Sequence, residues 1–289
     1  MDFLSLLKDQ KIIILDGATG TQFAQRGAAP GGGANLSAPD VVAAVHCAYI
    51  EAGSHAVIAN TFCLNRIYMD ANKINAGVDE INRAGVDIAR RAAGDNIAVL
   101  GDIGPTGKML KPVGDCTEEQ FIESFAEQAR ALAAAGADAF IVETMMDKNE
   151  AVCAVRACKQ VSSLPVIASM TFATTRDGGR TTMGHKASDC AAALTETGAD
   201  VLATNCGDLD PREVAIIVAS YRSASALPIL VEPNAGKPRL DDNNCAVYDM
   251  APEDFAQGVA TCMDAGATLI GGCCGTTPDH IRALARLAE

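Results

Sequence analysis

The feature that most constrains this fold is a short apolar run followed by a helical segment, repeated eight times along 289 residues. Such repeats are typical of βα units, which build a parallel sheet with helices on its faces. The sequence therefore predicts eight strands, at 11–15, 55–59, 97–100, 139–142, 166–170, 201–204, 229–231 and 268–270.

Continuity along the chain favours one α/β domain over residues 1–289. We find no long linker, composition shift or extended low-complexity tract between the units. Four helical segments end in Gly just before the next strand, as expected for a helix C-terminus; these are Gly53, Gly136, Gly198 and Gly266. Eight sequential units predict a single closed (β/α)8 TIM barrel, with a doubly wound open sheet as the rival.

Charge and hydropathy exclude several classes of protein. The net charge of −13 argues against binding to nucleic-acid phosphates, which requires clustered Lys and Arg. No apolar run approaches the ~20 residues of a membrane span, and the first residues do not resemble a signal peptide. We therefore expect a cytoplasmic protein without nucleic-acid or membrane partners.

The eleven cysteines are expected to be mostly free thiols. An odd count, the size of the chain and the missing signal peptide all indicate a reducing compartment. Five cysteines lie within apolar helical patterns, where Cys behaves as a small buried side chain: Cys47, Cys153, Cys158, Cys190 and Cys262.

Polar residues stand just past nearly every expected strand. In a TIM barrel the chemistry lies at the C-terminal ends of the strands, so these positions are the candidate site. They are Asp16, Asn60-Thr61, Asp102, Glu143, Thr171, Asn205-Cys206, Glu232, Asn234 and Cys273-Cys274.

Cys206, Cys273 and Cys274 follow the sixth and eighth strands and are candidate zinc ligands. A catalytic zinc site uses three protein ligands and keeps a fourth position open. Gly271, Gly272 and Gly275 would give the second turn the freedom to aim two sulfurs at one metal. A competing interpretation makes 271–277 a phosphate-binding loop before a helix, although such a loop has no use for two thiols.

Several motifs together resemble the homocysteine S-methyltransferase family, which includes the homocysteine-binding module of cobalamin-dependent methionine synthase and betaine-homocysteine methyltransferase. The resemblance spans the whole chain. It rests on Leu15-Asp16-Gly17-Ala18-Thr19-Gly20-Thr21, Asn60-Thr61-Phe62, Gly101-Asp102-Ile103-Gly104-Pro105-Thr106-Gly107, Glu143-Thr144-Met145, Thr204-Asn205-Cys206 and Gly271-Gly272-Cys273-Cys274-Gly275.

The resemblance implies a Zn²⁺ ion on the three cysteines, with the homocysteine sulfur as its incoming fourth ligand. It implies that Asp16, Gly17 and Glu143 contact homocysteine, the carboxylates serving the ammonium group. Thr61 would donate to the substrate carboxylate, unless it only caps the following helix. Asn234 would hold the vacant metal position, unless it forms an Asx-type turn before Gly236.

The methyl donor is the open question in the sequence. The segments Gly104-Pro105-Thr106-Gly107 and Gly179-Arg180-Thr181 resemble the methionine-synthase module more than the betaine enzyme, which favours a methylcobamide carried by a corrinoid protein. The absence of Trp and the presence of only four Tyr leave few aromatic cages for a cationic donor. The alternatives are a stand-alone enzyme using a sulfonium or betaine-type donor, and a thiol-binding subunit without turnover.

Overall fold

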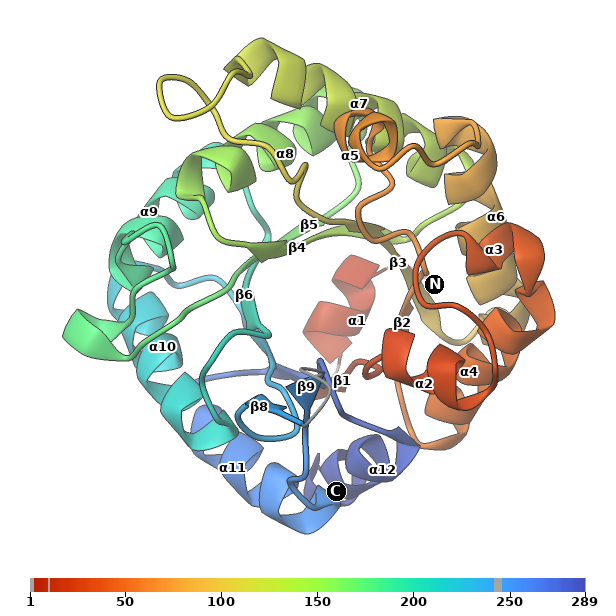
Figure 1. The fold of residues 1–289 in the computed structure, drawn as a ribbon. Coiled ribbons are helices and arrows are strands. Elements are labelled where there is room, and N and C mark those ends of the chain that lie inside the picture. The colour runs from red at the N-terminus through yellow and green to blue at the C-terminus, as the bar shows by residue number, and fades with distance from the viewer. Residues whose placement is uncertain (1–2, 10, 242–245, 289) are drawn as a thin grey trace.

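Residues 3–9, 11–241 and 246–288 are described by a computed structural model. Eight parallel strands form a ring in its centre, and helices surround the ring (Figure 1). This arrangement confirms the predicted (β/α)8 barrel. The strands are β1 (Ile13–Ile14), β2 (Ala56–Ile58), β3 (Ala98–Ile103), β4 (Ala139–Met145), β5 (Val166–Met170), β6 (Val201–Asn205), β7 (Ile229–Glu232) and β10 (Leu269–Ile270).

Long helices connect the strands on the outside of the ring. All four glycines expected to stop helices have positive φ angles, between 91° and 114°, so these predicted ends are confirmed. The outer helices are α4 (Pro39–Glu51), α6 (Val78–Ala93), α7 (Glu118–Ala134), α8 (Lys148–Val161), α9 (Ala187–Thr197), α10 (Pro211–Ala224), α11 (Pro252–Asp264) and α12 (Pro278–Ala288). Shorter helical segments are α1 (Phe3–Asp9), α2 (Gly20–Gln25), α3 (Ala34–Ser37), α5 (Arg66–Ala71) and η1 (Arg176–Gly178).

Side chains help to close the ring between β1 and β2, which stand at the two ends of the sheet order. The amide of His55 donates to the Ile14 carbonyl at 2.7 Å, and the Ile14 amide donates to His55 Nδ1 at 3.1 Å. One step further along, the Ile58 amide donates to Asp16 Oδ2 at 3.0 Å. Asp16 therefore joins the two strands at the mouth of the barrel.

The barrel interior is apolar at its N-terminal end. Phe3 and Leu6 of α1 pack against inward-facing strand residues, and Figure 1 shows α1 across the far opening of the ring. Most of the strand residues in this inner core are fully buried: Ile13, Leu15, Ala56, Ala98, Leu100, Ala139, Ile141, Ile167, Val201, Ala203, Leu230 and Leu269. Helix α1 thus closes the end of the barrel opposite the site.

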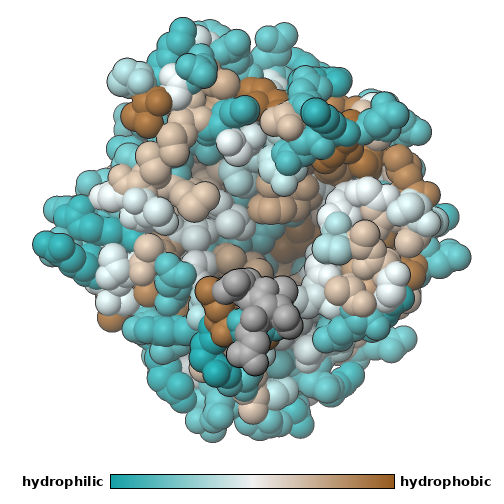
Figure 2. Space-filling model, in the orientation of Figure 1, coloured by the Kyte–Doolittle hydropathy of each residue, from teal (hydrophilic) through white to brown (hydrophobic). Residues whose placement is uncertain are grey.

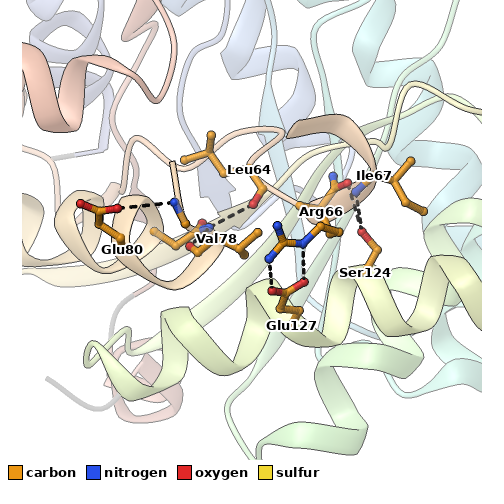
Figure 3. Close-up of polar contacts among 10 residues, drawn as sticks. Leu64, Arg66, Ile67, Val78, Glu80, Ser124 and Glu127 are labelled. Atoms are coloured by element: carbon orange, nitrogen blue, oxygen red, sulfur yellow. Dashed lines mark hydrogen bonds and ion pairs between the residues drawn. The ribbon is translucent and has the colours of Figure 1, made fainter. Parts of the chain in front are cut away.

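The segment after β2 is anchored on α7 and α6 (Figure 3). Arg66 makes two hydrogen bonds to the Glu127 carboxylate, at 3.1 and 2.5 Å, and the Ile67 amide donates to Ser124 Oγ at 3.0 Å. Asn82 Nδ2 donates to the Leu64 carbonyl at 3.0 Å. These contacts hold the chain that follows Thr61 at the rim.

Three features depart from the sequence-based predictions. Strands β3 and β4 extend three residues beyond their predicted ends. A two-stranded antiparallel hairpin, β8 (Arg239–Leu240) and β9 (Ala246–Val247), follows β7 without any predicted counterpart. Cys47 is exposed on α4, so its predicted burial was wrong, whereas the other four helical cysteines are buried.

Within the described residues, none of the helices has the length and apolar character needed to cross a membrane.

The buried stripe of α4 contains a histidine, and this predicts a loss of stability in acid. Val42, Val45, His46 and Tyr49 form the stripe, and neither ring nitrogen of His46 has a hydrogen-bond partner among the described residues. Burial lowers the pKa of His46 from 6.5 to about 4. In the unfolded chain His46 therefore binds a proton below about pH 6.5, whereas in the folded protein it binds one only near pH 4.

We expect the free energy of unfolding to fall by about 3 kcal/mol between pH 7 and pH 4 through this residue alone. Urea unfolding of the protein and of His46→Leu across that range isolates the effect, because the Leu variant lacks the titrating group. The half-exposed His185 provides the control, since His185→Gln should keep most of the acid loss. Parallel pH profiles for the protein and His46→Leu would contradict this account.

Candidate functional site

The layer of side chains at the mouth of the barrel is polar. Successive residues of a strand point to opposite faces, so every second residue faces the interior. Along β3, β4 and β7 the inward series passes from Leu100 to Asp102, from Ile141 to Glu143 and from Leu230 to Glu232. On β6 it passes from Ala203 to Asn205. The apolar core therefore ends in three carboxyl groups and one amide.

Three cysteine sulfurs converge on this mouth. The Sγ atoms of Cys206, Cys273 and Cys274 all lie within 4.8 Å of one another, and those of Cys206 and Cys274 are 3.8 Å apart. Cys206 directly follows β6 and has a φ of 56°, a left-handed conformation uncommon for residues other than Gly. The backbone turn there carries its thiol toward the pair that follows β10.

The spacing of the Cys206 and Cys274 sulfurs matches a tetrahedral thiolate site. Metal–sulfur bonds of about 2.3 Å in tetrahedral geometry place the sulfurs about 3.8 Å apart. The distance between Cys206 and Cys274 meets this value. Hydrogen bonding with the thiols of Cys206 and Cys273 lowers the pKa of Cys274 to about 3. The donor set is thus soft, close-packed and suited to a thiophilic metal such as zinc.

The turn that carries Cys273 and Cys274 is shaped by close packing. A Cβ on Gly272 would lie 2.6 Å from Thr276 Cγ2, and one on Gly271 would lie 3.0 Å from the Asp16 carbonyl oxygen. Only Gly275 of the three glycines has a positive φ, at 79°. The expected backbone freedom is therefore confirmed for Gly275, whereas Gly271 and Gly272 are needed for space.

Thr276 ties this turn to the first strand. Its Oγ1 accepts from the Ala18 amide at 3.0 Å and donates to the Cys273 carbonyl at 2.7 Å. The hydroxyl of Tyr49 donates to the Ala18 carbonyl at 2.7 Å. The Asp16-Gly17-Ala18 turn and the cysteine turn are thereby held together.

The alternative of a phosphate-binding loop finds little support. A phosphate loop presents free backbone amides to its ligand. Here the amides of Gly271, Gly272, Cys273 and Thr276 already donate to carbonyl oxygens of Val231, Asp16, Pro233 and Cys273, at 2.9 to 3.1 Å. These amides are thus used in hydrogen bonds within the protein, and the two thiols are the groups of this turn that could bind a ligand.

Four buried or half-buried carboxyl groups line the mouth, and burial raises the pKa of each. Burial and the neighbouring Glu143 raise the pKa of Asp102, which hydrogen-bonds to Glu143. Burial raises the pKa of Glu143 to about 7, against the effect of that hydrogen bond. The pKa values of Asp16 and Glu232 are raised by burial and by repulsion from the other acids. A positive charge placed among these four groups would therefore favour their ionised forms.

Several oxygens of this cluster have no hydrogen-bond partner among the described residues. They are Asp16 Oδ1, Asp102 Oδ1, both carboxyl oxygens of Glu232, and Asn234 Oδ1. Buried polar atoms without partners are costly and rare in folded proteins. A ligand that donates several hydrogen bonds, such as an ammonium group, would satisfy them.

Asn205 connects the carboxyl groups to the thiols. Its Nδ2 lies 3.0 Å from Glu143 Oε1, 2.7 Å from Thr144 Oγ1 and 3.7 Å from Cys273 Sγ. Its Oδ1 accepts from Ser169 Oγ at 2.7 Å. The amide is thus fixed in orientation, with its donor side toward both parts of the site.

The other candidate residues from the sequence, Asn234 and Gly17, make contacts mainly with the protein itself. Asn234 is buried, and its Nδ2 donates to the Gly207 carbonyl at 2.9 Å. Its Oδ1 does not form the alternative Asx turn. A Cβ on Gly17 would come within 2.6 Å of Thr276 Oγ1, so the close approach at this glycine is to the protein itself. A substrate contact of Gly17 or Asn234 stays a prediction.

Thr61 supports the end of β3. Its hydroxyl donates to the Asp102 carbonyl at 2.9 Å and accepts from the Asp102 amide at 3.0 Å, and its own amide donates to the Ala59 carbonyl at 2.7 Å. Gln128 adds hydrogen bonds to the Thr61 and Asp102 carbonyls. With both donors of Thr61 in use, a role in positioning Asp102 fits better than the predicted contact with the substrate carboxylate, which stays a prediction.

The sequence singled out only part of this site. Asp102, Asn205 and Glu232 were placed at the candidate site by their positions at strand ends, but the sequence alone assigned none of them an individual role. Thr276 carries no such signal, and neither does Tyr248, whose Cβ would lie 2.3 Å from a Cβ on Gly275, because each reaches the site through a loop.

Comparison with known proteins extends this description. A methionine synthase from Mycobacterium tuberculosis (strain ATCC 25618 / H37Rv) is 32% identical over an alignment of 306 residues, covering 98% of this chain and 25% of that protein. A methionine synthase from Mycobacterium leprae (strain TN) is 33% identical over 263 residues, covering 87% and 21%. The chain thus spans about a quarter of the length of these curated relatives.

Solved structures show the same fold. The homocysteine methyltransferase MmuM from Escherichia coli in its metallated form superposes with a TM-score of 0.81 at 24% identity, covering 99% of this chain and 100% of that one. The carboxyl transferase domain of Rhizobium etli pyruvate carboxylase has a TM-score of 0.57 at 14% identity, covering 97% and 48%. At these identities the likeness concerns the barrel alone.

Fold and site together define a (β/α)8-barrel protein with three converging thiols among buried carboxyl groups. The family model described as "Homocysteine S-methyltransferase" matches residues 13–288. The chain belongs to the homocysteine S-methyltransferase family, as the motifs predicted.

Metal binding should depend on the space around Gly272. In Gly272→Ala the new methyl group would collide with Thr276, whose hydroxyl is held by two hydrogen bonds. We expect the affinity of the protein for zinc to fall at least about tenfold, because tetrahedral thiolate coordination tolerates only small displacements of the sulfurs. Competition with a colorimetric zinc chelator measures this.

Two further variants frame the result. Gly33→Ala should bind zinc normally, because a Cβ there meets nothing within 4 Å. Cys273→Ser should lose most of the metal, which sets the scale for removal of one candidate ligand. Normal zinc affinity in Gly272→Ala would show that the packing of this turn does not position the sulfurs.

Proposed function

We propose that residues 1–289 act as one unit that transfers a methyl group to the thiol of homocysteine and so forms methionine. The observation that carries the proposal is the meeting of three thiols, within 4.8 Å of one another, with buried carboxyl groups, several of whose oxygens lack hydrogen-bond partners among the described residues. Homocysteine offers the two complementary groups, a thiol and an ammonium.

We propose that Cys206, Cys273 and Cys274 hold Zn²⁺. The match between the sulfur spacing and tetrahedral coordination supports this, as does the metallated form of the E. coli relative. A bound zinc ion would keep the substrate thiol deprotonated at neutral pH, where a free thiol with a pKa near 8.5 is largely protonated. Asn234, whose Oδ1 has no hydrogen-bond partner in the described part of the chain, would hold the open metal position or a water until substrate arrives.

The amino-acid end of the substrate would lie against the carboxyl groups. Glu143 and Asp16 are the proposed ammonium contacts, and Asp102 would support Glu143 through their hydrogen bond. An ammonium group stabilises the ionised carboxylates and so reverses the effect of burial on their pKa values. Gly17 and Thr61 complete the proposed contacts, the former through its backbone.

We propose a methylcobamide on a corrinoid protein as the methyl donor. Figure 2 shows a hollow on the face of the molecule that is turned to the viewer in Figure 1. Exposed apolar side chains stand on the segments after β2, β3, β4, β5 and β7; they are Phe62, Met109, Val113, Met146, Met183 and Leu240. Such side chains suit a large partner, and methionine rich surfaces adapt to one. The methionine synthase relatives are about four times longer than this chain, which agrees with a donor carried on other domains.

Two alternatives remain distinct from this donor. A small sulfonium or betaine-type donor would make the chain a stand-alone enzyme, but Tyr49 and Tyr221 are buried in the core and cannot cage it. A thiol-binding subunit without turnover would need its partner for any reaction. We also place the protein in a reducing compartment such as the cytoplasm, because the ten described cysteines are all free.

The choice among donors is open to direct assay. The zinc-loaded protein with homocysteine should form methionine from methylcobalamin, as the sulfur–carbon bond forms and the carbon–cobalt bond leaves both electrons on cobalt. Parallel reactions with S-methylmethionine and betaine should give none, measured by mass spectrometry. Methionine from either small donor alone would reject the corrinoid proposal, and none from all three, despite bound zinc, would favour a subunit that needs its partner.

Recognition of the ammonium group predicts a selective defect in Glu143→Gln. Removing one partner of a buried charge pair costs about 2–5 kcal/mol, so kcat/KM for homocysteine should fall by about 30-fold or more. The loss should be much smaller for 4-mercaptobutanoate, which lacks the amino group. The exposed Glu119→Gln variant on α7 serves as the control. Equal losses for both thiols would assign Glu143 a role other than ammonium recognition.

A further inference from the structure

The side chain of Gln128 links α7 to the ends of two barrel strands. Its Nε2 donates to the Thr61 carbonyl at 2.9 Å, to the Asp102 carbonyl at 3.1 Å and to Asn82 Oδ1 on α6 at 3.1 Å. The side chain is fully buried. Because all three neighbours are acceptors, the NH2 group must face them and Oε1 must face away.

This orientation of Gln128 has a cost in stability. Its Oε1 has no hydrogen-bond partner among the described residues, and a buried oxygen without a partner destabilises a folded protein. The two carbonyl groups already have donors, because the Leu64 amide donates to Thr61 at 3.2 Å and the Thr61 hydroxyl donates to Asp102 at 2.9 Å. An apolar side chain of similar size would avoid the unpaired oxygen. The amide is therefore better explained by the peptide groups that it orients than by stability.

One of these peptide groups joins Thr61 to Phe62 and leads into a turn at the rim. It is trans, so its N–H points opposite to its carbonyl. The Phe62 amide is therefore directed away from α7, which lies outside the ring (Figure 1). In the part of the chain that the structure describes, the amides of Phe62 and Cys63 have no hydrogen-bond partner. Cys63 has a φ of 56°, and successive unpaired N–H groups beside a left-handed residue can bind an anion.

We propose that Gln128 is a positioning residue, which orients the Thr61–Phe62 peptide so that the amides of Phe62 and Cys63 receive the substrate carboxylate. This inference rests on the proposed function, and it places the proposed carboxylate contact on the two amides that follow Thr61. Hydrogen bonds from backbone amides to a carboxylate are charge-assisted, and they weaken when the N–H turns away from the acceptor. Gln128 acts from the outer helix through the peptide group and does not touch the substrate.

The test compares the binding of two thiols to the full chain loaded with zinc, by isothermal titration calorimetry. Homocysteine carries the carboxylate, and 3-aminopropane-1-thiol lacks it but keeps the thiol and the amine. In Gln128→Met the side chain keeps its length and loses its donor. The Kd for homocysteine should rise at least about tenfold, as expected when a hydrogen bond to a charged group is lost, whereas the Kd for the aminothiol should stay within about twofold. Gln160→Met, which replaces an exposed glutamine on α8, is the matched control.

A second measurement needs no variant and so decides the case even if Gln128→Met does not fold. In amide hydrogen exchange of the unaltered protein, followed by NMR, homocysteine should slow the exchange of the Phe62 and Cys63 amides and the aminothiol should not. Unprotected amides would overturn the inference, and so would unchanged homocysteine binding or an equal loss for both thiols in folded Gln128→Met. Failure of the unaltered, zinc-loaded protein to bind homocysteine would instead reject the proposed function.

Discussion

The two-residue alternation of the barrel strands is the constraint on which the site depends. Because eight parallel strands point the same way, their inward residues form layers, and the last layer faces the mouth. Below it the layers are apolar and α1 seals the far end. The same periodicity that builds the core therefore places Asp102, Glu143, Asn205 and Glu232 on one surface, although these residues are far apart in the sequence.

This arrangement concentrates negative charge where water is scarce. Four carboxyl groups share the mouth with three thiols, and their pKa values are raised because burial and mutual repulsion both favour the protonated forms. Protons on these carboxyl groups and the hydrogen bond from Asn205 to Glu143 reduce the repulsion among them. A ligand with an ammonium group and a thiol would replace those protons with its own charge, which is why we favour an amino-acid thiol over an uncharged one.

The sequence predicted the parts of this site that follow from strand order. Cys206 and the Cys273-Cys274 pair could be assigned to one rim because, in a closed barrel, the ends of parallel strands meet. The contacts made by loops could not be predicted. Ala18 and Thr276 are 258 residues apart, and no periodic pattern in the sequence predicts the hydrogen bond between them. The β8–β9 hairpin and Tyr248 belong to the same class. Cys47 shows the limit within helices, since its neighbours are apolar but it faces outward.

Thr276 also bears on how the site would choose its substrate. One buried hydroxyl joins the turn after β1, which carries Asp16, to the turn after β10, which carries Cys273. The separation between Asp16, a candidate ammonium acceptor, and the thiol cluster therefore depends on two backbone turns that one buried side chain holds together. A thiol whose amino group lies at another distance would satisfy one end and leave buried oxygens unpaired at the other, at the cost that such groups carry. Discrimination by chain length would then follow from the packing of the two turns.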